Sequence, residues 1–163
     1  MKYIFVIALL FPLYTLAQDC KLHKETDPYT KETKLSTGFI KLQSSSVTID
    51  ANRMEIDVFF TLAGADKCFD NNSTAFIFFE GTKLKMTTRN SGSMNCEGFF
   101  HFTFRNTPGT NSLLQKLSAQ KINNIVFTGN GKKETKIIFT PEQQQTFTSL
   151  TTCLVNEAKT LIK

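Results

Sequence analysis

Residues 53–62 read RMEIDVFFTL, a stretch in which apolar and polar side chains alternate. Successive side chains of a strand point to opposite faces of its sheet, so this alternation predicts a strand with one buried face. The buried face is expected to carry Met54, Ile56, Val58, Phe60 and Leu62. The opposite, solvated face is expected to carry Glu55, Asp57 and Thr61.

Other segments show strand character, marked by alternation or by β-branched and aromatic residues between turn signals. They are residues 38–42, 46–50, 73–79, 82–89, 98–105, 122–128 and 132–140. We expect one antiparallel sheet of about six to seven strands. Segments 82–89 and 98–105 are expected to pair, with Met86 opposite Phe100 and Leu84 opposite Phe102. That register places Lys85 beside His101.

Two helices complete an α+β fold. Thr140, Pro141 and Gln143 form the start signal of the second helix: an N-cap, a proline at the first helical position and a capping-box partner. Apolar residues follow at helical spacing over about 20 residues, which predicts an amphipathic C-terminal helix. They are Phe147, Leu150, Leu154, Ala158 and Leu161. A short helix is expected around Leu113, Leu114 and Leu117, and both helices should pack on one face of the sheet.

The first 17 residues have the pattern of a signal peptide. Lys2 precedes an uncharged apolar run at residues 3–16, and Thr15-Leu16-Ala17 supplies small residues before a cut after Ala17. We expect residues 18–163 to form a single secreted or periplasmic domain. Within it, residues 19–36 are polar, show no clear period and are interpreted as an N-terminal arm with a turn at residues 27–30.

The cysteines fit an oxidising compartment. Four are present, an even number, and they are too widely spaced for a typical zinc site. Cys68 precedes the strand at 73–79 and Cys96 opens the strand at 98–105, so an up-down-up path brings these two to the same end of the sheet. The predicted disulfides are therefore Cys68–Cys96 and Cys20–Cys153.

Charge and composition exclude several classes of protein. The chain carries 19 basic and 14 acidic residues, and the basic ones are scattered instead of forming the dense stripe of a nucleic-acid binder. Charges interrupt every apolar run after the signal, so no transmembrane segment is expected in the mature chain. There is no phosphate-binding glycine loop, and no cofactor is expected.

Residues able to carry chemistry are few. His23, Glu25 and Asp27 form a string that could bind a metal, and Asp66, Asp70, Asn71 and Asn72 share a loop that could bind calcium, but neither follows a known ligand spacing. Glu55 and Asp57 share a strand face and could in principle act as a glycosidase pair. His101 could serve as a base if a carboxylate lay beside it. We therefore expect neither a metal site nor a defined catalytic set.

A basic band is the strongest binding hypothesis. It comprises Lys83, Lys85, Arg89, His101 and Arg105, interleaved with Phe76 and Phe78 if these share the face. Such a band would suit an anionic ligand or a partner protein, but the sequence favours the interpretation that the basic side chains only cover the sheet and keep it soluble. The sequence favours a noncatalytic binding or interaction domain of unknown ligand. The alternative is a small hydrolase using His101 with an unidentified carboxylate.

Overall fold

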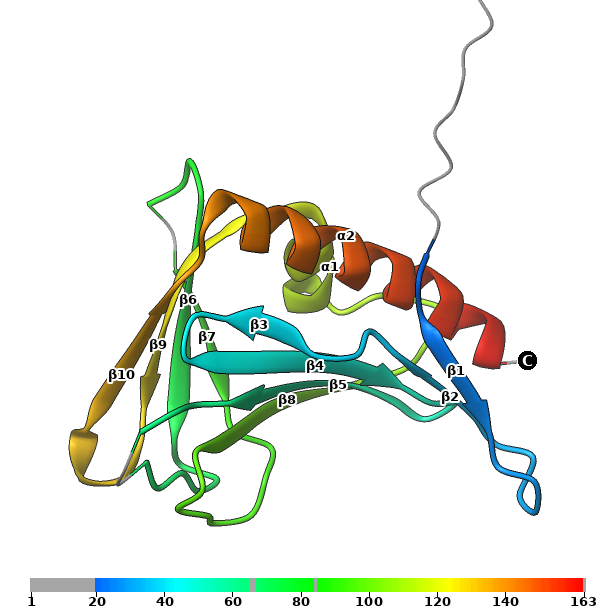
Figure 1. Cartoon of the computed structure of the whole chain (residues 1–163), viewed down its shortest axis with the longest axis horizontal. Helices are drawn as coiled ribbons and strands as arrows, with labels where there is room; N and C mark the ends of the chain where they lie inside the picture. Colours follow the sequence, from blue (N-terminus) through cyan, green and yellow to red (C-terminus); the bar gives the residue numbers. More distant parts are fainter. Residues whose placement is uncertain (1–19, 65–66, 84, 163) are drawn as a thin grey trace, which may run out of the picture.

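The computed structural model describes residues 20–64, 67–83 and 85–162. The predicted signal peptide and its cleavage site lie outside these residues, as do Asp66 and Leu84. The described chain is an α+β fold of two antiparallel sheets, two helices and two disulfides (Figure 1). No helix among the described residues is both long and apolar enough to cross a membrane.

The larger sheet has six strands and the smaller has four. The larger is ordered β1-β2-β4-β5-β8, with β3 paired to β4; its strands are β1 (His23–Thr26), β2 (Thr33–Ser36), β3 (Ile40–Leu42), β4 (Ser45–Ala51), β5 (Glu55–Thr61) and β8 (Phe99–Arg105). The smaller is ordered β10-β9-β6-β7; its strands are β6 (Thr74–Phe79), β7 (Lys85–Arg89), β9 (Ile122–Thr128) and β10 (Glu134–Ile138).

The expectation of one sheet was therefore wrong, and so was the pairing of segments 82–89 and 98–105. Lys85 lies opposite Phe78 in the smaller sheet, whereas His101 lies opposite Phe59 in the larger one. Alternation identifies the buried face of a strand but not its neighbour, and β5 offers β8 an equally apolar stripe. Phe100 lies opposite Phe60, so the partner changed while the apolar face remained as expected.

The stretch at 53–62 forms β5 with the predicted buried face. Ile56, Val58 and Phe60 are at most 3% exposed. Met54 departs from the prediction because it precedes the strand, in a turn where the Asn52 side chain accepts its backbone N–H, and it is 72% exposed.

The N-terminal arm is a β-hairpin, not an irregular segment. β1 pairs antiparallel with β2, and the Asp27 side chain accepts the backbone N–H groups of Tyr29 and Thr30 in the predicted turn. Every residue of β1 is exposed, so this edge strand leaves no apolar period for a sequence to reveal. The hairpin extends the larger sheet beyond β4.

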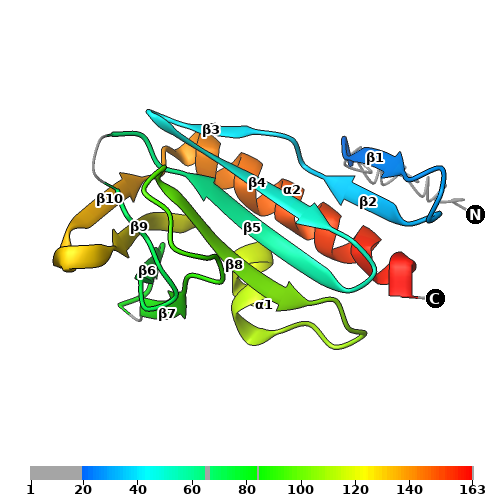
Figure 2. The same ribbon diagram turned by 90° about the horizontal axis from the view of Figure 1, so that it is seen from below.

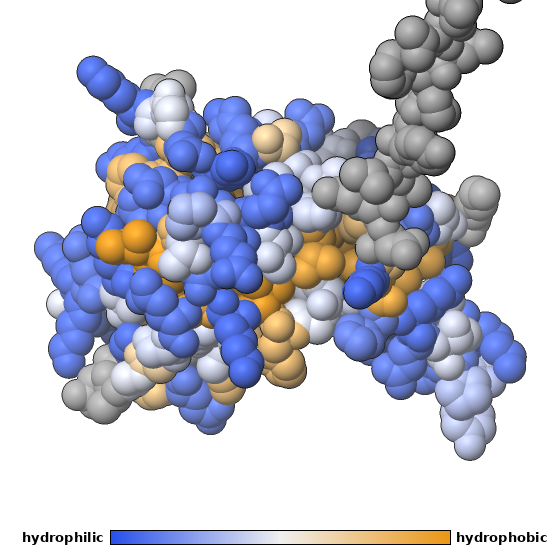
Figure 3. All heavy atoms as spheres, turned by 45° about the horizontal axis from the view of Figure 1, so that its top comes forward, coloured by the Kyte–Doolittle hydropathy of each residue, from blue (hydrophilic) through white to orange (hydrophobic). Residues whose placement is uncertain are grey.

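The helices are α1 (Ser112–Ala119) and α2 (Pro141–Ala158), and α2 continues into a short 3-10 turn, Lys159–Ile162. Thr140 and Gln143 form the predicted capping box at the start of α2. Helix α2 packs against α1 and against β2, β3 and β4, on the inner face of the larger sheet (Figure 1). Figure 3 views the molecule from the helix side. This face is mostly hydrophilic, and apolar residues form a band across its middle.

Phenylalanine rings join the two sheets. Phe127 on β9 lies 5.2 Å from Phe60 on β5 and 5.1 Å from Phe100 on β8, measured between ring centroids. Phe69, in the loop before β6, is 5.3 Å from Phe100. All four side chains are at most 1% exposed, so the core lies between the sheets as well as under the helices.

Both predicted disulfides are confirmed. Cys68–Cys96 joins the loops that precede β6 and β8. Cys20–Cys153 joins the segment before β1 to the middle of α2. The second bond therefore fastens the exposed N-terminal hairpin to the helical layer.

Candidate functional site

The outer face of the larger sheet is lined by polar side chains. Figure 2 shows β4, β5 and β8 with α2 behind them, so this face lies on the side opposite the helix. Residues directly opposite each other on neighbouring strands have their side chains on the same face of the sheet. One row of such residues runs across β1, β2, β4, β5 and β8. The aligned residues are His23, Ser36, Asp50, Asp57 and Thr103.

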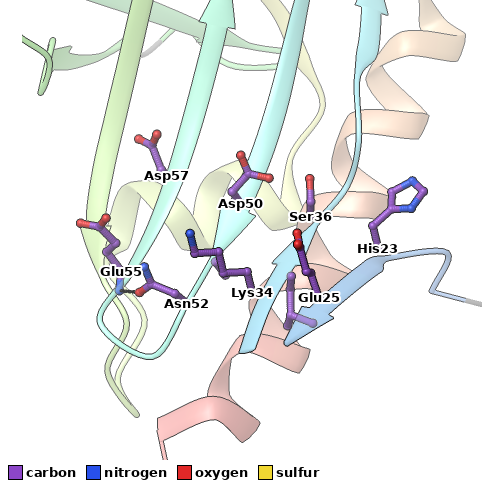
Figure 4. A pocket seen from close by; sticks show the side chains of 10 residues that line it. His23, Glu25, Lys34, Ser36, Asp50, Asn52, Glu55 and Asp57 are labelled. Atoms are coloured by element: carbon purple, nitrogen blue, oxygen red, sulfur yellow. Dashed lines mark hydrogen bonds between the residues drawn. The ribbon is translucent and has the colours of Figure 1, made fainter. Parts of the chain in front are cut away.

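The first four of these residues border a cavity of about 450 Å³, which we term the acidic trough. Its lining residues are His23, Glu25, Lys34, Leu35, Ser36, Asp50, Ala51, Asn52, Glu55 and Asp57. Figure 4 shows His23, Ser36, Asp50 and Asp57 in one row, with the other labelled side chains in the next. Four carboxylates thus face one lysine and one histidine, and the trough has a negative charge.

Three of these four carboxylates lack a close partner among the described residues. In the described part of the chain, no hydrogen bond or ion pair engages the carboxylates of Glu25, Asp50 and Glu55. By contrast, the Asn52 amide oxygen accepts the N–H of Glu55, and the Ser36 hydroxyl accepts the N–H of Gly38. The trough therefore presents acceptor groups to solvent that its own fold does not use.

Asp57 is the exception, because it has two partners at the end of the trough. The Thr103 hydroxyl donates to Asp57 Oδ1 at 3.1 Å, and His101 Nδ1 lies 3.4 Å from Asp57 Oδ2. His101 also packs edge-on against Phe59, with ring centroids 5.3 Å apart. Its Nε2 lies against Gly92, so close that any Cβ at that position would collide with the imidazole.

The carboxylate that His101 could use is thus Asp57, which sequence reasoning had not paired with it. Asp57 lies opposite Thr103 and His101 opposite Phe59, so the two are diagonal neighbours on β5 and β8. The arrangement differs from a nucleophile-imidazole-carboxylate triad, because the hydroxyl donates to the carboxylate and not to the imidazole. His101 is not among the residues that line the trough, and its second imidazole nitrogen, Nε2, lies against Gly92.

Burial and neighbouring charge set the protonation of Asp57. Loss of hydration on burial raises the pKa of the Asp57 carboxyl above its ordinary value of 3.8. The charge of His101 and the hydrogen bond from Thr103 act in the opposite direction, and the Glu55 carboxylate raises the pKa further. A cation bound in the trough would favour the ionised form.

The predicted basic band is divided between the two sheets. Lys85 lies on the outer face of the smaller sheet with its Nζ 4.3 Å from the ring centroid of Phe76, and Arg89 lies opposite Thr74 on the same face. Lys83 is exposed in the turn before β7. His101 and Arg105 belong to β8 of the larger sheet. Strands β7 and β8 were expected to be neighbours, but they belong to different sheets. Binding of an anionic ligand at Lys83, Lys85 and Arg89 stays a prediction.

Several of the acidic residues considered from sequence lie together in the acidic trough. Glu55 and Asp57 share the outer face, as expected, and both line the trough. His23 and Glu25 line its other end, whereas Asp27 closes the hairpin turn. Within the described residues, no three of the histidine, cysteine and acidic side chains form a group that could hold a metal ion.

Asp50 was missed because only the β4–β5 register brings it beside Asp57, and Ser36 and Lys34 were missed because only the pairing of β2 with β1 and β4 brings them to this face. The alternation of segment 46–50 was the available signal, since it places Asp50 on the face opposite Val47 and Ile49. A polar residue at the end of a strand is too common to mark a site without the register.

The fold and the trough define a two-sheet α+β protein with a polar, acidic sheet face. No family model matches the chain, and no curated protein or solved structure shows significant similarity to it.

Replacing Asp57 tests the electrostatics of the trough. A raised pKa means that the folded state holds the proton more tightly than the unfolded chain, so stability falls as the pH rises from 3.8 through the folded pKa and stays reduced above it. Asp57→Asn removes this dependence. Measured by urea titration, the free energy of unfolding of the variant should therefore increase relative to that of wild type as the pH rises from about 3 to about 7.

Asp27→Asn is the matched control with the opposite sign. Backbone N–H groups of Thr30 and Tyr29 lower the pKa of Asp27, so its contribution is present above the ordinary pKa and is lost as the pH falls through the folded one. This variant should therefore become relatively less stable as the pH rises. Parallel pH profiles for the two variants would contradict the assignment.

Proposed function

We propose that the protein is an exported, noncatalytic binding protein that takes a cationic ligand in the acidic trough. The observation that carries the proposal is the open cavity lined by Glu25, Asp50, Glu55 and Asp57, three of which engage no group of the described chain. Complementary charge attracts and orients a ligand in such a site. Export is supported by the two disulfides, which form and persist in oxidising compartments.

The charge of the trough argues for a cation over the anionic ligand considered for the basic band. Lys34 is its one permanent positive charge, against four carboxylates. An anion would meet net repulsion here, whereas an ammonium or guanidinium group could pair with Asp50 or Glu55. The proposal therefore assigns the trough to amine-bearing or basic-peptide ligands.

The hydrolase alternative has one supporting observation, the contact between His101 and Asp57. Three features favour binding over hydrolysis. His101 is not among the residues that line the trough, its Nε2 is covered by Gly92, and the hydroxyl of Thr103 donates to Asp57. Together they favour a role for His101 in holding Asp57 and the loop after β7 in place.

A second cavity, of about 470 Å³, lies between the β3 region and the start of α2, but two of its polar residues already serve the fold. Gln143 donates to the Lys41 carbonyl and accepts from the Thr140 N–H, and the Thr140 hydroxyl accepts from the Gln143 N–H. A ligand there would compete with the helix cap. A ligand that binds Glu25, Asp50 or Glu55 in the acidic trough displaces no hydrogen bond of the described chain from these carboxylates.

Calorimetric titration with trilysine at low ionic strength tests the proposal, with triglutamate as the opposite-charge probe. Trilysine should bind, its affinity should fall with added salt, and triglutamate should not bind. Asp50→Asn/Glu55→Gln should weaken trilysine binding about tenfold, because two exposed charge pairs are lost. Affinity should also rise as the pH rises through the pKa of Asp57, since the cation prefers the ionised carboxyl.

Glu80→Gln/Glu97→Gln is the matched control. It removes the same charge at two exposed positions outside the trough, so trilysine affinity should stay within about twofold of wild type. Equal loss in both double variants would reduce the effect to net charge and refute a defined site. Turnover of a panel of ester, amide and glycoside substrates that Asp57→Asn or His101→Gln abolishes would favour the hydrolase instead.

A further inference from the structure

Strand β10 forms one free edge of the smaller sheet. Its only strand partner in the described chain is β9, and the sheet continues from β9 through β6 to β7. In Figures 1 and 2, β10 lies at the margin of the molecule, with β9 on one side and no other element on the other. Such an edge can accept another strand.

The backbone groups that face outward follow from the ladder with β9. Phe139 donates its N–H to the Asn123 carbonyl, and Gly129 donates to the Lys133 carbonyl. Antiparallel pairs alternate between bonded and non-bonded positions, so the odd-numbered residues of β10 face β9. The N–H and C=O groups of Glu134, Lys136 and Ile138 therefore point away from the sheet.

A second copy related by a two-fold axis can use these groups in three registers. Centring the axis on Lys136 opposes two lysines, and centring it on Ile137 opposes Lys136 and Ile138. Centring it on Thr135 opposes Glu134 of each copy to Lys136 of the other, as two bonded pairs with four main-chain hydrogen bonds. Both side chains lie on the outer face of the sheet, so each bonded pair also joins opposite charges.

The other edge of the smaller sheet lacks this complementarity. In β7, Asn90 donates its N–H to the Ser73 carbonyl, so the outward groups belong to Lys85, Thr87 and Arg89. Two-fold pairing of that strand offers no opposite charges, and its central register opposes Lys85 to Arg89. Basic residues on an edge discourage strand addition, which leaves β10 as the self-complementary edge.

We propose that two copies of this chain associate through antiparallel pairing of their β10 strands, centred on Thr135. The pairing joins two four-stranded sheets into one continuous eight-stranded sheet. Ile138, which is 51% exposed on the outer face, is brought next to the partner copy and becomes partly covered. The acidic troughs lie on the other sheets and stay open, so the dimer presents two ligand sites.

Sedimentation equilibrium across a range of protein concentrations, up to about 1 mM, tests the proposal. Wild type should show a monomer-dimer equilibrium, weak because the contact is a single strand pair and far smaller than a standard interface. Glu134→Lys should raise the dimer dissociation constant about tenfold or more, because two attractive pairs become repulsive. Glu134→Lys/Lys136→Glu should restore it to within about threefold, because the swap preserves complementarity.

Glu32→Lys is the matched control, since it makes the same charge change at an exposed position in the β1–β2 turn of the larger sheet and should leave the dimer intact. Thr135→Cys gives an independent readout. Residue 135 forms a non-bonded pair across the axis, where Cα atoms lie about 4.5 Å apart, so a reducible covalent dimer should form. Lys136→Cys, which faces Glu134 of the partner, should form far less of it.

Three results would each overturn the proposal: a monomer at every concentration, a dimer unaffected by Glu134→Lys, or a double swap that fails to recover association while circular dichroism shows a native fold. Equal cross-linking of Thr135→Cys and Lys136→Cys would refute the register.

Discussion

Removal of the Cys20–Cys153 disulfide by a Cys20→Ala/Cys153→Ala double replacement is expected to lower the free energy of unfolding by about 5 kcal/mol. The two cysteines are 133 residues apart, so their bond closes a loop that includes most of the chain in the unfolded state. In the loop-entropy model, a longer closed loop gives a larger stabilisation. Domains of this size are stable by only about 5–15 kcal/mol, so the variant should be close to unfolded at 37 °C.

The other disulfide supplies the internal comparison. Cys68 and Cys96 are 28 residues apart, and the same model gives about 3.5 kcal/mol for Cys68→Ala/Cys96→Ala. Urea unfolding of both variants in parallel measures the difference. If the shorter loop gives the larger loss, native contacts around Cys68 and not chain entropy dominate the effect.

The longer disulfide also links stability to the proposed ligand site. It fastens the segment before β1 to α2, while His23 and Glu25 of β1 form one end of the acidic trough. Every side chain of β1 is exposed, so packing contributes little to holding that strand. Cys20→Ala/Cys153→Ala should therefore weaken trilysine binding under conditions in which the rest of the domain is still folded. Cys68→Ala/Cys96→Ala should not weaken it under those conditions.

Features decided by local chemistry could be predicted from the sequence. The buried face of β5 followed from strict alternation, and the start of α2 followed from Thr140, Pro141 and Gln143, whose capping box is present. The disulfides followed from chain direction, because an up-down-up path brings Cys68 and Cys96 together whether the strands belong to one sheet or to two. Each of these inferences depends on neighbours along the chain.

Features decided by which strand lies beside which could not be predicted. The stripe of Phe100, Phe102 and Phe104 fits either Met86 on β7 or Phe60 on β5, and an apolar stripe has no directional signal to choose between them. β1 escaped notice because an exposed edge strand buries neither face. The undirected stripe of β8 explains why a single sheet was predicted, and the exposure of β1 explains why the hairpin was not.

The candidate site could be predicted only in part for the same reason, because it depends on the order of the strands. Glu55 and Asp57 were placed on one face, since this needs only their own strand. Asp50 joined them through the β4–β5 register, and His101 reached Asp57 through the β5–β8 register. A trough built across strands is visible only once the order of those strands is known, so the sequence offered a speculative basic band along two wrongly paired strands and no acidic site.

Phe127→Ala is expected to lower the free energy of unfolding by about 3–5 kcal/mol, the loss typical of deleting a fully buried aromatic ring. Phe127 is wholly buried and lies 5.2 Å from Phe60 and 5.1 Å from Phe100, ring centroid to ring centroid, so it contacts two strands of the larger sheet. The cavity would open between the sheets, where neither can close it without moving against the other. Urea unfolding followed by circular dichroism measures the loss.

Phe39→Ala deletes the same ring at a site that is 77% exposed and should change stability by no more than about 0.5 kcal/mol. A double-mutant cycle then separates the contact between the sheets from burial alone. Phe127→Ala combined with Phe60→Ala should show a coupling of about 0.5–1.5 kcal/mol, because the ring pair spans the sheets. Zero coupling would mean that the two sheets are held together elsewhere, by the helices and the disulfides and not by the phenylalanine cluster.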